Sequence, residues 1–231
     1  MKISDNHITE LYRFTREHFV EHYDVQTELV DHLANDIEQI WQAQPDLSFQ
    51  EAKTISFKKF GVFGFMDVVG SRQKTLEKRY WKTILRFVKD WFQFPKIIIT
   101  LIMYSSLFLL FTSSVSEFVF VGIIVCYFFF GIVKIIQLKS IFNKRKKRLG
   151  KTWMLEDLIF KQGVGNAAVL PLYTFQIFIH TGDSTSVSLI WGALLALFYT
   201  AIFIIGYISL VILPQKAEEL LSETYPEYKL S

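Results

Sequence analysis

The sequence predicts an all-α protein in which a small cytoplasmic helical bundle is followed by a four-helix transmembrane bundle. Hydrophobic residues make up 51% of the 231-residue chain, which is high for a soluble globule. They are distributed unevenly, because four long apolar runs lie between Trp91 and Leu213, whereas the earlier residues mix charged and apolar side chains at helical spacing. We therefore expect a head at residues 1–90, a membrane domain at 91–213 and a cytoplasmic tail at 214–231.

Capping signals divide the head into helices. Asp5 or Asn6 can cap a first helix, and Asp24 can cap a second, since both positions precede apolar residues that recur every three or four positions. Ser48 followed by Glu51 three residues later is a capping box, which predicts the start of a third helix.

A fourth helix is expected from about residue 65 to residue 91. Its last part, YWKTILRFVKDWF, interleaves aromatic residues with Lys82, Arg86 and Lys89. This pattern is typical of a helix that lies on the membrane surface or of one that leads into the first span. No linker rich in Gly, Ser or Pro separates the head from the membrane domain, so we expect the two parts to be mechanically coupled.

Four apolar stretches approach the roughly 20 residues that a membrane-spanning helix needs. The third is diluted by Asn166, Pro171 and Gln176, but it is retained because an even number of spans places both ends of the chain on one side. The predicted spans cover residues of about 94–113, 118–138, 163–180 and 188–213.

The orientation follows from the loop at residues 139–153, which is strongly basic, whereas the two opposite turns, SSVSE and HTGDSTS, contain no Lys or Arg. By the positive-inside rule this loop and both termini are cytoplasmic. The N-terminus shows no cleavable signal, so the head is expected to stay on the side where it is made, and the expected location is a bacterial cytoplasmic membrane. Because the basic block lies between two spans, we favour contacts with membrane lipids over nucleic acid as a partner. The residues expected to fix topology and contact anionic lipids are Lys139, Lys144, Arg145, Lys146, Lys147, Arg148 and Lys151.

Charge also divides the head. Residues 1–50 contain ten acidic and three basic residues, whereas residues 51–90 contain ten basic and four acidic residues. An acidic tip held away from an anionic membrane and a basic base drawn toward it would give the head a preferred pose. The tip is either a solvated acidic face, the favoured interpretation, or the surface that receives a basic protein partner.

The stretch HFVEH, residues 18–22, matches the H-x-x-E-H signature of inverted zinc peptidases. If one helix continues through it, His18 and His22 lie on the same face, where they are weak candidates for metal ligands. A third ligand and a substrate cleft are hard to find in so small a head, so ordinary histidines at a helix end are the favoured interpretation. The sequence contains no G-x-x-x-x-G-K-[ST], G-x-G-x-x-G, H-E-x-x-H or G-x-S-x-G motif, and it predicts no catalytic residue and no cofactor.

The third span carries the polar residues that need an explanation inside a membrane. Asn166 and Gln176, together with Pro171, describe an interrupted helix of the kind that lines substrate sites in transporters. Hydrogen bonding between helices is the simpler interpretation. In the fourth span Gly192 and Ala196 are spaced to let another helix approach closely, which is compatible with a homo-oligomer.

The head resembles a known kind of domain. An acidic residue, His and Leu at Asp31, His32 and Leu33 precede a helix of the form S-x-x-E-A that ends in Phe60 and Gly61. Over about residues 5–75 this arrangement is similar to the helical HAAS-type domain at the N-terminus of some bacterial membrane proteins. The resemblance implies a role in signalling beside PadR-type regulators and supplies no catalytic residues.

These observations predict a non-catalytic multi-pass bacterial membrane protein whose cytoplasmic helical head acts as a signalling or protein-interaction module. A small transporter or channel that uses the polar third span is the alternative. A metal-dependent membrane enzyme that uses His18 and His22 ranks third.

Overall fold

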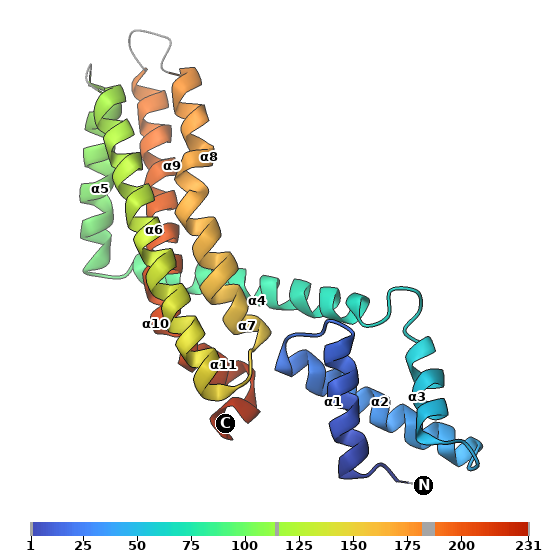
Figure 1. The fold of residues 1–231 in the computed structure, drawn as a ribbon. Coiled ribbons are helices and arrows are strands. Elements are labelled where there is room, and N and C mark those ends of the chain that lie inside the picture. The colour runs from blue at the N-terminus through green and yellow to red at the C-terminus, as the bar shows by residue number, and fades with distance from the viewer. Residues whose placement is uncertain (1, 114–115, 182–187, 231) are drawn as a thin grey trace. The chain divides into compact units, whose positions relative to one another are not determined.

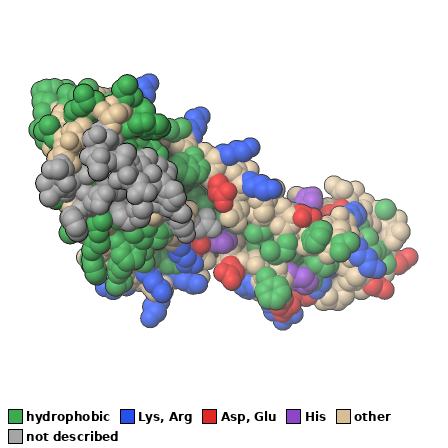
Figure 2. Space-filling view, turned by 90° about the horizontal axis from the view of Figure 1, so that it is seen from above, with side chains coloured by type: hydrophobic (Ala, Val, Ile, Leu, Met, Phe, Trp, Pro, Cys, Tyr) green, Lys and Arg blue, Asp and Glu red, His purple; other side chains and the backbone are tan. Residues whose placement is uncertain are grey.

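The computed structural model describes residues 2–113, 116–181 and 188–230, in which every regular element is a helix (Figure 1), so the all-α prediction is confirmed for these residues. The chain forms two compact units. We call Met1–Lys78 together with Lys146–Leu155 the head unit, and Arg79–Arg145 together with Glu156–Ser231 the apolar unit. Hydrophobic side chains gather over the helices of the apolar unit, whereas acidic and basic side chains are spread over the head unit (Figure 2).

The head unit is built from α1 (Asp5–Glu17), α2 (Tyr23–Ala43), α3 (Phe49–Lys58) and the first part of α4 (Met66–Trp91). The long α2 packs against both α1 and α3. Its buried side chains recur every three or four residues, as the sequence spacing predicts. The largest apolar contributions from α1 and α2 are Leu11, Val25, Leu29, Leu33, Ile37 and Trp41.

Two helix starts test the capping predictions. The box at Ser48 is confirmed, because its Oγ accepts from the amide of Glu51 at 3.3 Å and Glu51 Oε2 accepts from the amide of Ser48 at 2.9 Å. The first helix begins at Asp5, but its cap is Ser4, which pairs reciprocally with His7. Asp24 lies inside α2 and does not cap it, since the N-cap is His22 without a side-chain bond.

Ion pairs connect the acidic and basic halves of the head. Lys53 and Lys59 of the α3 region lie 2.6 Å from carboxylate oxygens of Glu10 and Asp36, respectively. Arg72 of α4 lies 3.8 Å from Glu28 of α2. The two halves therefore neutralise each other in part where they pack, and the separation of charge predicted from the sequence is smaller than the residue counts indicate.

The apolar unit contains the end of α4 and the remaining helices, among which two turns are π-helical. Its elements are α5 (Lys96–Phe111), α6 (Ser116–Leu149), α7 (Met154–Asp157, whose first two residues belong to the head unit), η1 (Leu158–Gly163), α8 (Val164–Thr181), α9 (Leu189–Tyr207), η2 (Ile208–Ile212), α10 (Leu213–Gln215), α11 (Ala217–Thr224) and η3 (Pro226–Leu230).

Within the described residues, two helices are long and apolar enough to cross a membrane, Val119–Leu149 and Leu189–Gln215. They contain the second and fourth predicted spans. The helices α4 and α5 give a third candidate if the pair is counted as one span, although they meet at an angle of 92°. Two to three spans are thus supported by length and composition, and the count of four stays a prediction.

The long helices of the apolar unit pack around a cluster of rings from Phe111, Phe120 and Tyr199, with ring centroids 4.6–5.8 Å apart. Small residues allow the close approach. A Cβ at Gly192 would lie 3.0 Å from Thr112 Cγ2 of the turn after α5, and one at Gly206 would collide with the hydroxyl of Tyr127. The small residues of the fourth predicted span are therefore used within the chain.

The basic stretch after the second predicted span differs from the prediction. Helix α6 continues to Leu149, so residues 139–149 are helical and the connection to α7 is limited to residues 150–153. The extension is explained by composition, because Lys and Arg are good helix formers and stabilise a helix when they lie in its last turn.

The pair formed by Lys53 and Glu10 predicts an acid-sensitive contact in the head. The hydrogen bond from Lys53, and next the bond from Gln50, lower the pKa of Glu10. A lowered folded-state pKa means that the contact stabilises the head above the unfolded pKa of about 4.3 and loses this contribution as the pH falls through the folded value.

Replacing Lys53 by Met, which keeps an apolar stem against Phe14, should therefore lower the stability of the α1–α3 contact by about 1 kcal/mol at neutral pH. The same change should reduce the dependence of stability on pH in the acid range. Amide hydrogen exchange of α1 and α3 at several pH values measures both effects. Lys58→Met on the exposed side of α3 is the control, and equal behaviour of the two variants would contradict the assignment.

Candidate functional site

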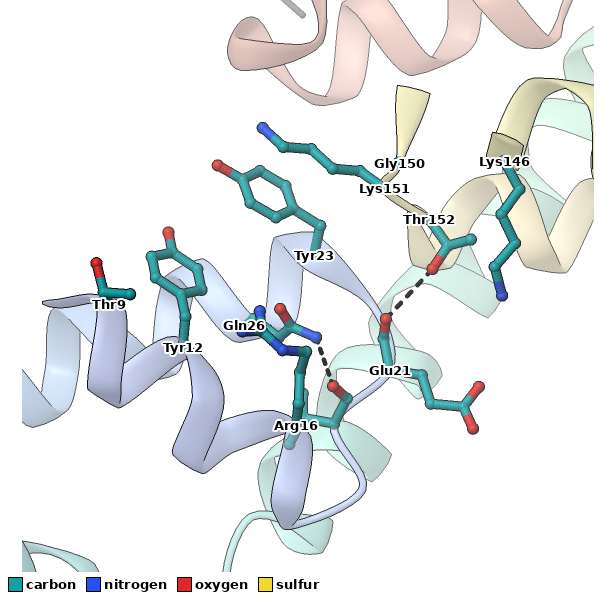
Figure 3. A pocket seen from close by; sticks show the side chains of 11 residues that line it. Thr9, Tyr12, Arg16, Glu21, Tyr23, Gln26, Lys146, Gly150, Lys151 and Thr152 are labelled. Carbon is teal, nitrogen blue, oxygen red and sulfur yellow. Dashed lines mark hydrogen bonds between the residues drawn. The ribbon is translucent and has the colours of Figure 1, made fainter. Parts of the chain in front are cut away.

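The chain returns to the head after α6, and this return forms the candidate site. We call residues 150–155 the docked segment. The amide of Tyr23 donates to the carbonyl of Thr152 at 2.8 Å, and Thr152 Oγ1 donates to the carbonyl of Glu21 at 3.2 Å (Figure 3). The buried Trp153 packs edge-on against Tyr23 with ring centroids 5.3 Å apart. The start of α2 thus holds a segment that is distant in sequence.

Asp24 completes this contact. Its buried carboxylate accepts from the amide of Met154 at 3.1 Å. Met154 is the first residue of α7, so Asp24 supplies an acidic side chain to an orphan amide at the start of a helix that belongs to another part of the sequence. The acidic residue that we assigned to the start of its own helix therefore caps a different one.

A cavity of about 720 Å³ lies beside the docked segment, entirely within the head unit (Figure 3). The charged residues of its lining are three cations, Arg16, Lys146 and Lys151, and one carboxylate, Glu21. The ammonium group of Lys151 lies 3.9 Å from the ring centre of Tyr23, a cation–π contact. The lining is formed by Thr9, Tyr12, Arg16, Val20, Glu21, Tyr23, Gln26, Lys146, Gly150, Lys151 and Thr152.

The pKa values of the two tyrosines in the cavity, Tyr12 and Tyr23, are shifted in opposite directions. Burial raises the pKa of Tyr12, and its bond to Thr27 offsets this only in part. Burial also acts on Tyr23, but hydrogen bonds from Lys151, Thr27 and Tyr12 outweigh it and lower the pKa of Tyr23. Because three cations and one carboxylate line the cavity, it can accept an anionic group such as a carboxylate or phosphate.

The predicted metal ligands are not brought together. Helix α1 ends at Glu17, Phe19 has a left-handed backbone with φ of 63°, and the amide of Val20 closes the turn on the carbonyl of Thr15. His18 and His22 therefore lie on opposite sides of a turn, and the rule that residues i and i+4 share a helix face does not apply.

The ring of His18 has another role. Its Nδ1 lies 2.8 Å from the carbonyl of Phe14, and the ring packs against Phe57 and Phe65. Within the described part of the chain there is no group of three or more His, Cys, Asp or Glu side chains placed to hold a metal ion. The zinc-peptidase interpretation gains no support from this geometry.

The predicted basic residues divide into three groups. Lys139, Lys144, Lys147 and Arg148 are exposed on the last turns of α6, where they remain candidates for anionic-lipid contacts. Lys146 and Lys151 line the cavity of the head unit. Arg145 is only 13% exposed and forms a structural ion pair, which the sequence gave us no reason to expect.

Arg145 joins three elements of the apolar unit. Its Nε donates to Glu156 at 2.8 Å, Nη1 to Glu218 at 2.9 Å and Nη2 to the hydroxyl of Tyr228 at 2.6 Å. The guanidinium is thus held charged beside a carboxylate that is 99% shielded from solvent.

The predicted intramembrane polar site at Asn166 and Gln176 stays a prediction. Asn166 lies on the first turns of α8 with an exposed side chain, and the side chain of Gln176 lies outside the described residues. Ten residues of α-helix separate the two along the axis by about 15 Å. The helix itself runs through Pro171 without a break, and the irregular turn is the π-helical η1 before it.

Comparisons with protein-family models, with curated proteins and with solved structures find no match. The resemblance of the head to HAAS-type domains therefore stays a prediction. The class that the structure itself supports is a helical protein with two to three helices of membrane-spanning length and composition.

Asp24→Ala should release the docked segment. The variant removes the acceptor of the Met154 amide, so we expect a loss of about 1–3 kcal/mol of local stability. Hydrogen exchange at the amides of Met154 and Tyr23 would accelerate accordingly. Asp31→Ala, at an exposed position of the same helix, is the control, and protection that survives in Asp24→Ala would contradict the capping role.

Arg145→Gln should destabilise the apolar unit by about 3–5 kcal/mol, because it leaves the buried carboxylate of Glu156 without its compensating charge. Thermal unfolding of the purified protein in nanodiscs measures the change. Arg148→Gln, three residues on and exposed, removes the same charge without the network and should have a much smaller effect. Equal losses in the two variants would show that net charge, not the ion pair, is responsible.

Proposed function

We propose that this chain is a non-catalytic multi-pass protein of a bacterial cytoplasmic membrane whose helical head is a signalling or protein-interaction module. The observation that carries the proposal is the docked segment. The chain leaves the apolar unit after Arg145, binds the start of α2 and re-enters the apolar unit at Glu156. A partner that changes the conformation of α1 or α2 would therefore act on the docked segment, whose residues continue directly into α6 and α7.

The cavity gives such a partner a place to act. Its lining combines α1, α2, Lys146 of α6 and the docked segment. A group bound there would therefore contact both the N-terminal helices of the head and the segment that docks on them. The excess of cations favours an acidic segment or another anionic group over the basic partner that the acidic residue count of the head indicates. Both termini are proposed to be cytoplasmic on the basis of the basic residues between the two long apolar helices.

The test is chemical crosslinking with mass spectrometry in native membranes, applied to the wild type and to Asp24→Ala and Asp31→Ala. We expect one stoichiometric partner linked to lysines of the head in the wild type and in Asp31→Ala. In Asp24→Ala its yield should change by about fivefold, the effect of about 1 kcal/mol on an equilibrium. Recovery of the protein alone, crosslinked only through its apolar helices and identical in all three forms, would reject the interaction module.

A further inference from the structure

The second half of α4 presents three distinct faces within the apolar unit. At 3.6 residues per turn, one face contains the residues that pack inward, which are Tyr80, Ile84, Phe87 and Trp91. A second, adjacent face exposes large apolar side chains, with Trp81 55% and Leu85 65% accessible, and Phe92 in the turn directly after the helix is 49% accessible. A third carries the exposed cations Lys82, Arg86 and Lys89. A helix whose outer faces contact only water does not need to place its exposed apolar and basic residues on separate faces.

The inward face fixes how the other two are presented. The hydroxyl of Tyr80 is hydrogen-bonded to Ser209, and its ring occupies the space that a Cβ on Gly163 would need. At the other end, Trp91 Nε1 donates to Thr100 Oγ1 of α5 at 3.0 Å, and its ring lies 5.4 Å from that of Tyr207. Contacts at both ends prevent this half of α4 from rotating about its axis, so the face that carries Trp81 and Leu85 stays exposed.

The angle between α4 and α5 decides between the two interpretations that the sequence left open. The helices meet at 92°, across the short break between Trp91 and Lys96. Helix α5 exposes apolar residues along its length, including Ile98, Ile102 and Leu109, as expected of a helix in lipid. If α5 is oriented across the bilayer, α4 runs along its surface and cannot be the beginning of the same span.

We propose that residues 79–91, with Phe92 directly after them, form an interfacial helix that binds an anionic bilayer surface. Trp81, Leu85 and Phe92 lie at the boundary of headgroups and acyl chains, and the three cations beside them contact lipid phosphates. An aromatic and aliphatic stripe flanked by Lys and Arg matches anionic lipid in both polarity and charge. The proposal rests on the membrane location of the chain and is independent of any protein partner of the head.

Spin labels on the full-length protein test the apolar face. In a Cys126→Ser background, single labels would be introduced by Trp81→Cys, Leu85→Cys, Lys82→Cys and Lys89→Cys, with Leu109→Cys as the lipid reference and Lys58→Cys as the aqueous reference. In nanodiscs that contain phosphatidylglycerol, labels at 81 and 85 should be accessible to oxygen and protected from a water-soluble nickel chelate, as at 109. Labels at 82 and 89 should resemble the label at 58.

Two results would overturn the apolar contact. Access of the nickel chelate to positions 81 and 85, equal to that at 58, would place this face in water. Protection from both reagents would mean that protein, such as a second copy of this chain, covers it. Because the protein is purified and alone in the nanodisc, neither result depends on whether the head has a signalling partner.

The role of the cations is tested separately. The triple variant Lys82→Gln, Arg86→Gln and Lys89→Gln should make the label at 85 shallower in nanodiscs with phosphatidylglycerol but leave it unchanged in phosphatidylcholine. The control replaces three exposed cations of the head, Lys2, Lys58 and Lys74, by Gln and should have no effect in either lipid. An equal depth at 85 in wild type and triple variant, in both lipids, would reject the contact with anionic headgroups.

Discussion

The ion pair of Arg145 and Glu156 joins the two residues that flank the segment Lys146–Leu155, which belongs to the head unit. Both residues belong to the apolar unit, so their contact brings the ends of this excursion of the chain together. Burial of Glu156 would be costly by itself, but Arg145 offers a rigid fork that also reaches Glu218 and Tyr228. With its ends fixed, the excursion loses less conformational entropy when it docks on α2.

A second set of contacts makes the head a single body. The three cations that come from α3 and α4 meet carboxylates of α1 and α2, and the largest apolar side chains of α2 fill the space between the helices. Partly exposed pairs of this kind contribute little individually. Their importance is geometric, because they connect α3 and the first part of α4 to α1 and α2 within the head unit.

Features decided within a few residues could be predicted from the sequence. The capping box at Ser48 and the extent of α4, expected from about 65 to 91 and found at Met66–Trp91, are of this kind. The second and fourth spans were recognisable because composition alone marks them. In each case the signal and the structure lie in the same stretch of chain.

What could not be predicted depends on residues far apart. Asp24 and Met154 are separated by 130 positions, and Arg145 and Glu218 by 73. An acidic residue near a helix start, or an arginine in a basic block, gives no sign of a partner at that distance. The cavity was missed for the same reason, since its lining joins α1 and α2 to the docked segment.

The stretch HFVEH shows how local information can mislead when one assumption fails. Its interpretation as a metal site required a continuous helix, and the residue that ends the helix is itself in the motif. Phe19 adopts a left-handed conformation that costs a residue with a Cβ about 1 kcal/mol or more, and its side chain is 82% exposed. The turn persists because Val20 is buried beyond it and the amide of Val20 is bonded to Thr15. The turn then delivers Glu21, Tyr23 and Asp24 to the docked segment, so the chemistry of this stretch is hydrogen bonding between distant parts of the chain.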